Sequence, residues 1–345
     1  MKELIKNYIS TIIIIILGYI FFTTNGYYNG FLFYNIRIID ITINTKDIFF
    51  YLMIFYFIIL IPFYFLEKEI SKARIIFGAI KNKIKDKKYN INNEEKNAIL
   101  AWLVKLFFVP LMIIWISSNI SEVINNLYYS DLNFNNIINN FYSIFNSFLF
   151  ITIFKIIIFI DLFFFTLGYL VESKYLGNKI KSVEPTMLGW VVAIVCYPPF
   201  NGAIDNFIGW YSSDFPRFEN IYLHIFLNIV LLISFAIYSR ASISLGLKAS
   251  NLTNRGIIEK GPYKYVRHPA YISKNIAWFI GAIPLIILNI KNLDFFNLII
   301  IFLSLGAWMS IYYMRAITEE RHLEMDKDYV EYKKKVRYKF IPGIY

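Results

Sequence analysis

The chain has 345 residues, of which 57% are hydrophobic and only 17% are charged. Average soluble proteins carry about 25% charged residues, so this composition excludes a soluble enzyme, a disordered chain and a collagen-like rod. The formal net charge of +11 is explained by membrane topology rather than by a nucleic-acid partner, as shown below. One cysteine, Cys196, and three histidines argue against a metal site. We therefore expect an all-α polytopic transmembrane protein.

Eight apolar stretches are long enough to cross a bilayer, which takes about 20 residues of helix. In chain order they are residues 5–22, 48–66, 98–116, 141–170, 187–210, 221–239, 271–290 and 295–314. The fourth contains Lys155 and Asp161, and the fifth is interrupted by Pro198-Pro199. These interruptions keep counts of seven to nine spans open.

The positive charges predict the orientation of these spans. With eight spans and a cytoplasmic N-terminus, most Lys and Arg residues lie on the cytoplasmic side, as the positive-inside rule requires. Only Arg37, Lys46, Arg217 and Lys291 lie outside. The external stretch 117–140 has no Lys or Arg. We expect both termini to be cytoplasmic and the protein to lie in the cell (inner) membrane, in contact with membrane lipids.

The segment RASISLGLKASNLTNRGIIEKGPYKYVRHP, which ends at Pro269, groups polar residues at the cytoplasmic boundary. Pro269 lies just before the seventh span and is typical of the first turn of a helix. Arg267 and His268 therefore put a cation and an imidazole at a helix N-terminus, where free N–H groups favour an anion. This pattern predicts a site for a carboxylate.

A second polar cluster follows the eighth span, with Arg315, Glu319 and Glu320 in the sequence RAITEERHL. Arg315 and Glu319 are four residues apart and can simply pair along the helix. Alternatively, the two carboxylates bind an ammonium group. The short connection between the last two spans predicts an antiparallel hairpin, which brings both clusters to one face. Together they match a zwitterionic amino acid moiety.

These motifs carry a resemblance. GPYKYVRHPAY at 261–271, a hairpin, RAITEERHLEMDKDYVEYKKKV at 315–336 and Ile341-Pro342 together resemble the isoprenylcysteine carboxyl methyltransferase family. The family is grouped with the phospholipid N-methyltransferases, and its members are integral-membrane enzymes that use S-adenosylmethionine. The resemblance is strong from Arg240 onwards and weaker from Pro185. It implies a methyltransferase domain over 185–345 and leaves 1–184 as a transmembrane region of unknown role.

The resemblance implies roles for individual residues. Arg315 would contact the substrate and, with Glu319, would be catalytic. The cofactor-binding set would comprise Arg255, Gly256, Ile257, Ile258, Tyr263, His268, Pro269, Ala270, Tyr271, Glu319 and Glu320. Many family members have Gly where this chain has Ser273, and Lys274 then adds a cation to the first turns of the helix, which would alter the substrate entrance.

The expected reaction is methyl transfer from S-adenosylmethionine to a lipophilic acceptor that enters from the bilayer. No residue clearly supplies the base that an amine acceptor needs, so a carboxylate or thiol of a prenylated or lipid-like molecule is favoured over a lipid amine. A small-solute transporter is the alternative from another class. It rests on the intramembrane charges Lys105, Lys155, Asp161 and Asp205, for which Lys155–Asp205 and Lys105–Asp161 pairs are conceivable.

Overall fold

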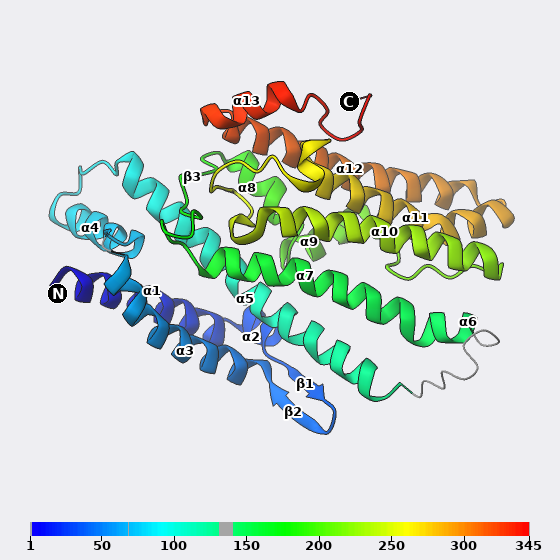
Figure 1. The fold of residues 1–345 in the computed structure, drawn as a ribbon, viewed down its shortest axis with the longest axis horizontal. Coiled ribbons are helices and arrows are strands. Elements are labelled where there is room, and N and C mark those ends of the chain that lie inside the picture. The colour runs from blue at the N-terminus through cyan, green and yellow to red at the C-terminus, as the bar shows by residue number, and fades with distance from the viewer. Residues whose placement is uncertain (1, 68, 131–140, 345) are drawn as a thin grey trace. The chain divides into compact units, whose positions relative to one another are not determined.

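The computed structural model describes residues 2–67, 69–130 and 141–344 and forms two compact units (Figure 1). The first unit comprises Met1–Asn125, Phe165–Val183 and Leu247–Arg255. The second comprises Asn126–Phe164, Glu184–Gly246 and Gly256–Tyr345. Residues 131–140, which belong to the expected external stretch, lie outside the described residues.

Seven helices in the described part of the chain are long and apolar enough to span a membrane, which confirms the all-α polytopic fold and seven of the predicted spans. They are α1 (Lys2–Thr24), α3 (Thr45–Leu66), α5 (Asn93–Tyr128), the helix Phe141–Leu170, α10 (Ile221–Leu245), α11 (Pro269–Lys291) and α12 (Phe295–Leu323). The helix Phe141–Leu170 consists of α6 (Phe141–Ile144), one π turn (Phe145–Leu149) and α7 (Phe150–Leu170).

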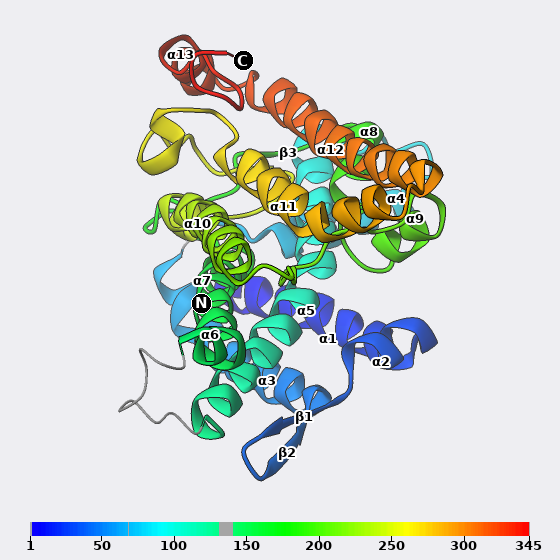
Figure 2. The same cartoon turned by 90° about the vertical axis from the view of Figure 1, so that its right-hand side faces the viewer.

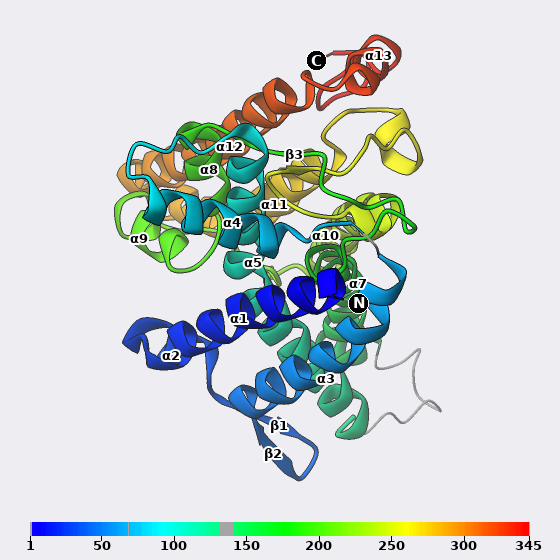
Figure 3. The same cartoon turned by 90° about the vertical axis from the view of Figure 1, so that its left-hand side faces the viewer.

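In the first unit, α1 packs beside α3 and is joined to it by the hydroxyl groups of Thr11 and Tyr64, 2.6 Å apart (Figure 3). Along the chain, α1 is followed by α2 (Gly26–Leu32) and by an antiparallel hairpin of β1 (Asn35–Ile38) and β2 (Ile41–Asn44), which leads into α3. The amphipathic helix α4 (Lys72–Lys85) packs against α1. A short antiparallel pair joins β3 (Ser182–Val183) to β4 (Thr253–Asn254).

A half-buried ion cluster lies in the first unit. The carboxylate of Glu172 accepts from the ammonium groups of Lys72 and Lys105, the latter at 2.9 Å. Burial would raise the pKa of this carboxyl, but Lys105 and Lys72 outweigh it and hold the pKa well below its usual range. Lys105 therefore pairs with Glu172 and not with Asp161, the partner that the sequence left conceivable. Asp161, in the second unit, accepts from the hydroxyls of Tyr238 (2.9 Å) and Ser242.

The second unit is built around the predicted hairpin. In Figures 1 and 2, α11 lies between α10 and α12, and the contacts agree. Three residues, Asn292–Asp294, connect α11 to α12, and the Asp294 carboxylate caps α12 by accepting from the N–H of Asn297 at 3.1 Å. After α12, the short helix α13 (Lys327–Lys335) leads into the C-terminal tail.

The predicted fifth span is not one continuous helix. It forms α8 (Met187–Ile194) and α9 (Phe200–Ile208), which are separated at Pro198-Pro199. Proline lacks an N–H and disfavours helical conformation in the residue before it, so two consecutive prolines stop the helix. Each piece is too short to cross a bilayer alone.

The broken segment still follows the whole α11–α12 hairpin. At one end, Arg321 near the end of α12 contacts the Glu184 carboxylate at 3.0 Å. Midway, the carbonyl oxygen of Gly209 accepts from Trp308 Nε1 at 3.1 Å. At the far end, Lys291 pairs with Glu219 at 2.6 Å. The chain thus passes from one end of the hairpin to the other through a broken helix.

Candidate active site

The site begins in the turn before α11. Gly261 has a φ of +62°, and a Cβ atom there would overlap Ser244, so only glycine fits this position. One 3₁₀ turn (Gly261–Lys264) follows, and Pro269 starts α11 in its first turn, as predicted. Arg267 and His268 directly before it are both buried. The turn therefore brings a cation and an imidazole into the protein rather than leaving them at its surface.

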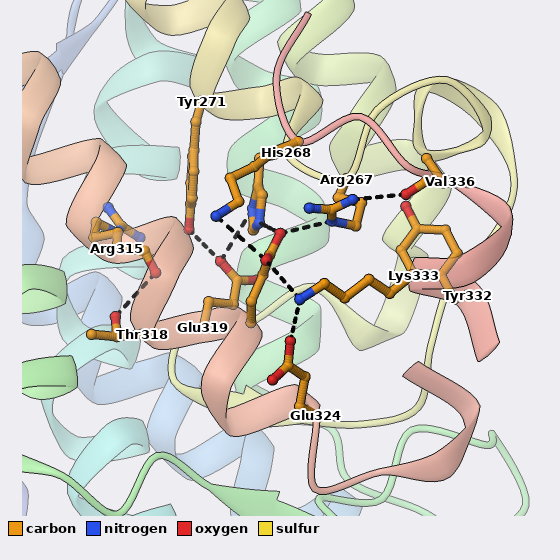
Figure 4. A network of polar contacts seen from close by, with 12 residues as sticks. Arg267, His268, Tyr271, Arg315, Thr318, Glu319, Glu324, Tyr332, Lys333 and Val336 are labelled. Carbon is orange, nitrogen blue, oxygen red and sulfur yellow. Dashed lines mark hydrogen bonds and ion pairs between the residues drawn. The ribbon is translucent and has the colours of Figure 1, made fainter. Parts of the chain in front are cut away.

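Figure 4 shows the polar network around Arg267, His268 and Lys333. Glu320 contacts all three of these residues, and its side chain is only 5% exposed. Its carboxylate accepts from Arg267 Nε at 2.8 Å and contacts His268 Nε2 at 3.1 Å. The ammonium groups of Lys339 and Lys333 lie at 3.5 and 3.7 Å. The predicted meeting of the two clusters therefore occurs, and a buried carboxylate joins them.

The C-terminal tail completes the environment of Arg267 and His268. Four consecutive backbone carbonyl groups accept from these two residues at 2.6 to 3.0 Å. The acceptors are Val336 and Arg337 for the Arg267 guanidinium, Tyr338 for the Arg267 N–H and Lys339 for the His268 N–H. Because carbonyl groups of any residue type can do this, the sequence gives no indication of the contact.

Glu319 differs from its neighbour, since its side chain is 44% exposed. Its carboxylate accepts from the Tyr271 hydroxyl at 2.6 Å, and His268 Nδ1 lies 3.8 Å away. The His268 and Tyr271 rings stack at 5.2 Å with an interplanar angle of 10°. Glu319 is thus oriented by one hydroxyl but remains open to solvent or a ligand.

Arg315 is buried, and its guanidinium lies 5.2 Å from the ring centroids of both Tyr271 and Tyr312. Such cation–π contacts hold the charge in place. Tyr271 links Arg315 to Glu319, because its ring faces the first and its hydroxyl bonds the second.

The remaining predicted cofactor residues of the second unit lie between Gly256 and Ala270. Ile257 and Tyr263 pack with the aromatic cluster of α13, where the Tyr332 hydroxyl donates to the Tyr263 carbonyl oxygen at 2.8 Å. Ile258 and Ala270 are half-buried, and Gly256 has a φ of +98°.

Arg255 belongs to the first unit, where its buried guanidinium donates to the carbonyl oxygens of Val171 and Asn178 at 3.1 and 3.0 Å. These hydrogen bonds from the side chain to backbone carbonyl groups give Arg255 a structural role. A cofactor role for Arg255 stays a prediction from the resemblance.

Three features of the second unit were not predicted as site residues. Glu184 is buried and accepts from Arg321. His322 is 4% exposed and lies 4.0 Å from Glu184. Tyr329 is buried, and in the described part of the chain its hydroxyl has no hydrogen-bond partner. Burial raises the pKa of Tyr329, so the hydroxyl keeps its proton.

The side chains fit the chemistry of S-adenosylmethionine, which carries an ammonium, a carboxylate and a sulfonium. The exposed Glu319 carboxylate suits the ammonium group. The unpartnered Tyr329 hydroxyl is a further donor. The donor set is therefore compatible with this cofactor.

Comparison with known families gives one match. Residues 221–325 match the isoprenylcysteine carboxyl methyltransferase (ICMT) family. The matched segment runs from the first residue of α10 to just beyond α12 and contains every predicted site residue. It confirms the resemblance over this segment and implies a methyltransferase. Searches with the chain for similar curated proteins and for similar solved structures gave no match.

Proposed function

We propose that this chain, whose residues 221–325 match the isoprenylcysteine carboxyl methyltransferase (ICMT) family, is an integral-membrane methyltransferase that uses S-adenosylmethionine. The acceptor is a lipophilic molecule bearing a carboxylate or a thiol, such as a prenylated compound. The reaction takes place at the cytoplasmic face of the cell membrane. The single observation that carries the proposal is the convergence of the RHP and RxxxEE motifs on one network within the matched segment.

The proposed division of roles follows from exposure. Glu319 is open and oriented by Tyr271, so it receives the ammonium group of the cofactor. Glu320 is buried among cations and holds the RHP turn against α12. The resemblance in sequence placed both carboxylates in the cofactor site. We now propose that only Glu319 binds the cofactor and that Glu320 is a positioning residue.

Arg315 is proposed to bind the acceptor. It lies one helical turn before Glu319, and its planar guanidinium can hold a carboxylate through two parallel hydrogen bonds. The bound cofactor supplies an electrophilic methyl group, so the protein has to align and desolvate the acceptor rather than activate a poor leaving group. His268 is engaged with Glu320, which leaves it poorly suited to act as the base that an amine acceptor requires.

A lipid-amine methyltransferase is the alternative within the same chemistry. The transporter alternative rested on four intramembrane charges, and two of these have partners within their own units. Lys105 pairs with Glu172, and Asp161 is held by two hydroxyls. The observations therefore favour the enzyme.

The proposal is tested by isothermal titration calorimetry of the purified chain in detergent with S-adenosylhomocysteine. Saturable binding by the wild type is expected. Radiolabelled methyl transfer to N-acetyl-S-farnesylcysteine then tests the acceptor class, with its methyl ester as the blocked control. Absence of S-adenosylhomocysteine binding contradicts the proposed activity. Binding without transfer to this acceptor contradicts only the acceptor class.

A further inference from the structure

Lys274 lies in the second turn of α11 and is surrounded by aromatic rings. Its ammonium group is 5.2 Å from the ring centroid of Tyr238, 5.7 Å from that of Tyr312 and 6.0 Å from that of Trp278. Across the residues that the structure describes, no side chain or carbonyl group forms a hydrogen bond or ion pair with this ammonium. Aromatic faces stabilise the charge but satisfy none of its three N–H donors.

The nearby carboxylates do not neutralise Lys274 by direct contact. Asp161 and Asp214 are within electrostatic reach. However, the two oxygens of Asp161 already accept from Tyr238 and Ser242. This arrangement fixes the Tyr238 ring under the ammonium and leaves its N–H donors available. The Lys274 side chain is half-buried, so a ligand can reach these donors.

Lys274 shares an aromatic neighbour with Arg315. Both cations lie over the ring of Tyr312, at 5.7 and 5.2 Å from its centroid. The Tyr312 side chain is buried between Trp278 and Tyr271 in edge-to-face contacts. An anion that reaches this ring would therefore meet two positive charges, whereas an ammonium group would be repelled by both.

We propose that Lys274 is a specificity-determining residue that contacts the anionic group of the acceptor together with Arg315. This inference rests on the proposed function, because it concerns the acceptor side of the same site. It assigns to one side chain the preference for an anionic over a neutral or cationic headgroup. Arg315 orients the acceptor, and Lys274 selects its charge.

The test compares wild type, Lys274→Met and Lys274→Arg in the full chain. Methionine keeps an unbranched apolar side chain, and arginine keeps the charge. Affinity is measured in detergent for S-farnesylthioacetic acid and for S-farnesylthioacetamide, which differ only in the charge of the headgroup. S-adenosylhomocysteine affinity is measured in parallel.

Lys274→Met is expected to lower the affinity for the acid by about tenfold or more, because a charge-assisted hydrogen bond is lost. Affinity for the amide and for S-adenosylhomocysteine stays within about twofold, and Lys274→Arg retains most of the preference for the acid. An equal loss for acid and amide, or no loss for either, overturns the inference. A wild type that binds S-adenosylhomocysteine but prefers neither probe overturns the role of Lys274 alone, whereas one that binds none of the three ligands overturns the proposed function as well.

Discussion

Replacing Glu320 or Glu319 by glutamine separates the structural carboxylate from the ligand-binding one. Glutamine has the same shape as glutamate but no charge. In Glu320→Gln, the buried Arg267 loses the carboxylate 2.8 Å from its Nε. Removing one member of a buried ion pair typically costs about 3 to 5 kcal/mol, since the other charge stays buried and uncompensated. We expect a loss in unfolding free energy of about 3 kcal/mol, because the carbonyl oxygens of Val336 and Arg337 still accept from Arg267.

Glu319→Gln is the matched control at the neighbouring position. Its side chain is 44% exposed, and the amide oxygen can still accept from the Tyr271 hydroxyl. We expect a stability change below about 1 kcal/mol, as for other exposed charges. Affinity for S-adenosylhomocysteine should fall by about tenfold or more, because a charge-assisted contact to the ammonium is lost.

The two variants are compared by denaturant unfolding in mixed micelles and by calorimetry with S-adenosylhomocysteine. The double variant Arg267→Met with Glu320→Gln provides a cycle. Its cost should be smaller than the sum of the two single costs, because neither charge is then left alone. Equal destabilisation by Glu319→Gln and Glu320→Gln would refute the division of roles, as would a Glu320→Gln protein of unchanged stability.

Three further predictions use other parts of the molecule. Arg315→Lys should keep S-adenosylmethionine affinity within a few-fold and lower radiolabelled methyl transfer by about 10²-fold. The reason is that an ammonium group cannot form the two parallel hydrogen bonds that a planar guanidinium forms with a carboxylate. Parallel loss of cofactor affinity and methyl transfer would place Arg315 in the cofactor site. In a Cys196→Ser background, a cysteine at Asn126 should react with an impermeant thiol reagent added from outside. A cysteine at Lys85 should react only after the membrane is permeabilised, and the reverse pattern would invert the topology. Because the pKa of Glu172 is depressed in the folded protein, its stabilising contribution is present above about pH 4.5 and is lost as the pH falls further. The unfolding free energy of the wild type should therefore drop between about pH 5 and pH 3, and that of Glu172→Gln should drop less. Equal slopes for the two proteins would contradict the pairing.

The sequence predicted the parts of the fold that depend on local pattern. Apolar runs of about 20 residues identified the continuous spans, since backbone groups in a bilayer have to be satisfied within the helix. The proline in the first turn of α11 and the short connection to α12 were likewise readable, and they bring Arg267 and Arg315 to the same end of the hairpin. Pro198-Pro199 marked the interrupted span, but whether the chain bends back or continues beyond the break depends on contacts such as Gly209 with Trp308.

Contacts between residues far apart in the chain could not be predicted. The Arg255 guanidinium is held by carbonyl oxygens at Val171 and Asn178, and every residue type offers such a group. The same reason hides the tail carbonyls that accept from Arg267. Glu172 lies only just beyond a span, so nothing in the local pattern indicates that two lysines converge on it.

The adjacent carboxylates of α12 illustrate how tertiary packing assigns different functions to identical residues. In sequence, Glu319 and Glu320 form one acidic pair, and an ammonium site made of both is a reasonable interpretation. With about 3.6 residues per turn, however, consecutive helical side chains point about 100° apart, so they cannot both face one ligand without distortion. The RHP turn and the tail cover the side of Glu320, whose carboxylate is needed to neutralise Arg267. Glu319 remains exposed beside Tyr271, so it is the carboxylate that a ligand can reach. The positive charges around Glu320 neutralise that carboxylate, so the negative charge at the site comes from Glu319.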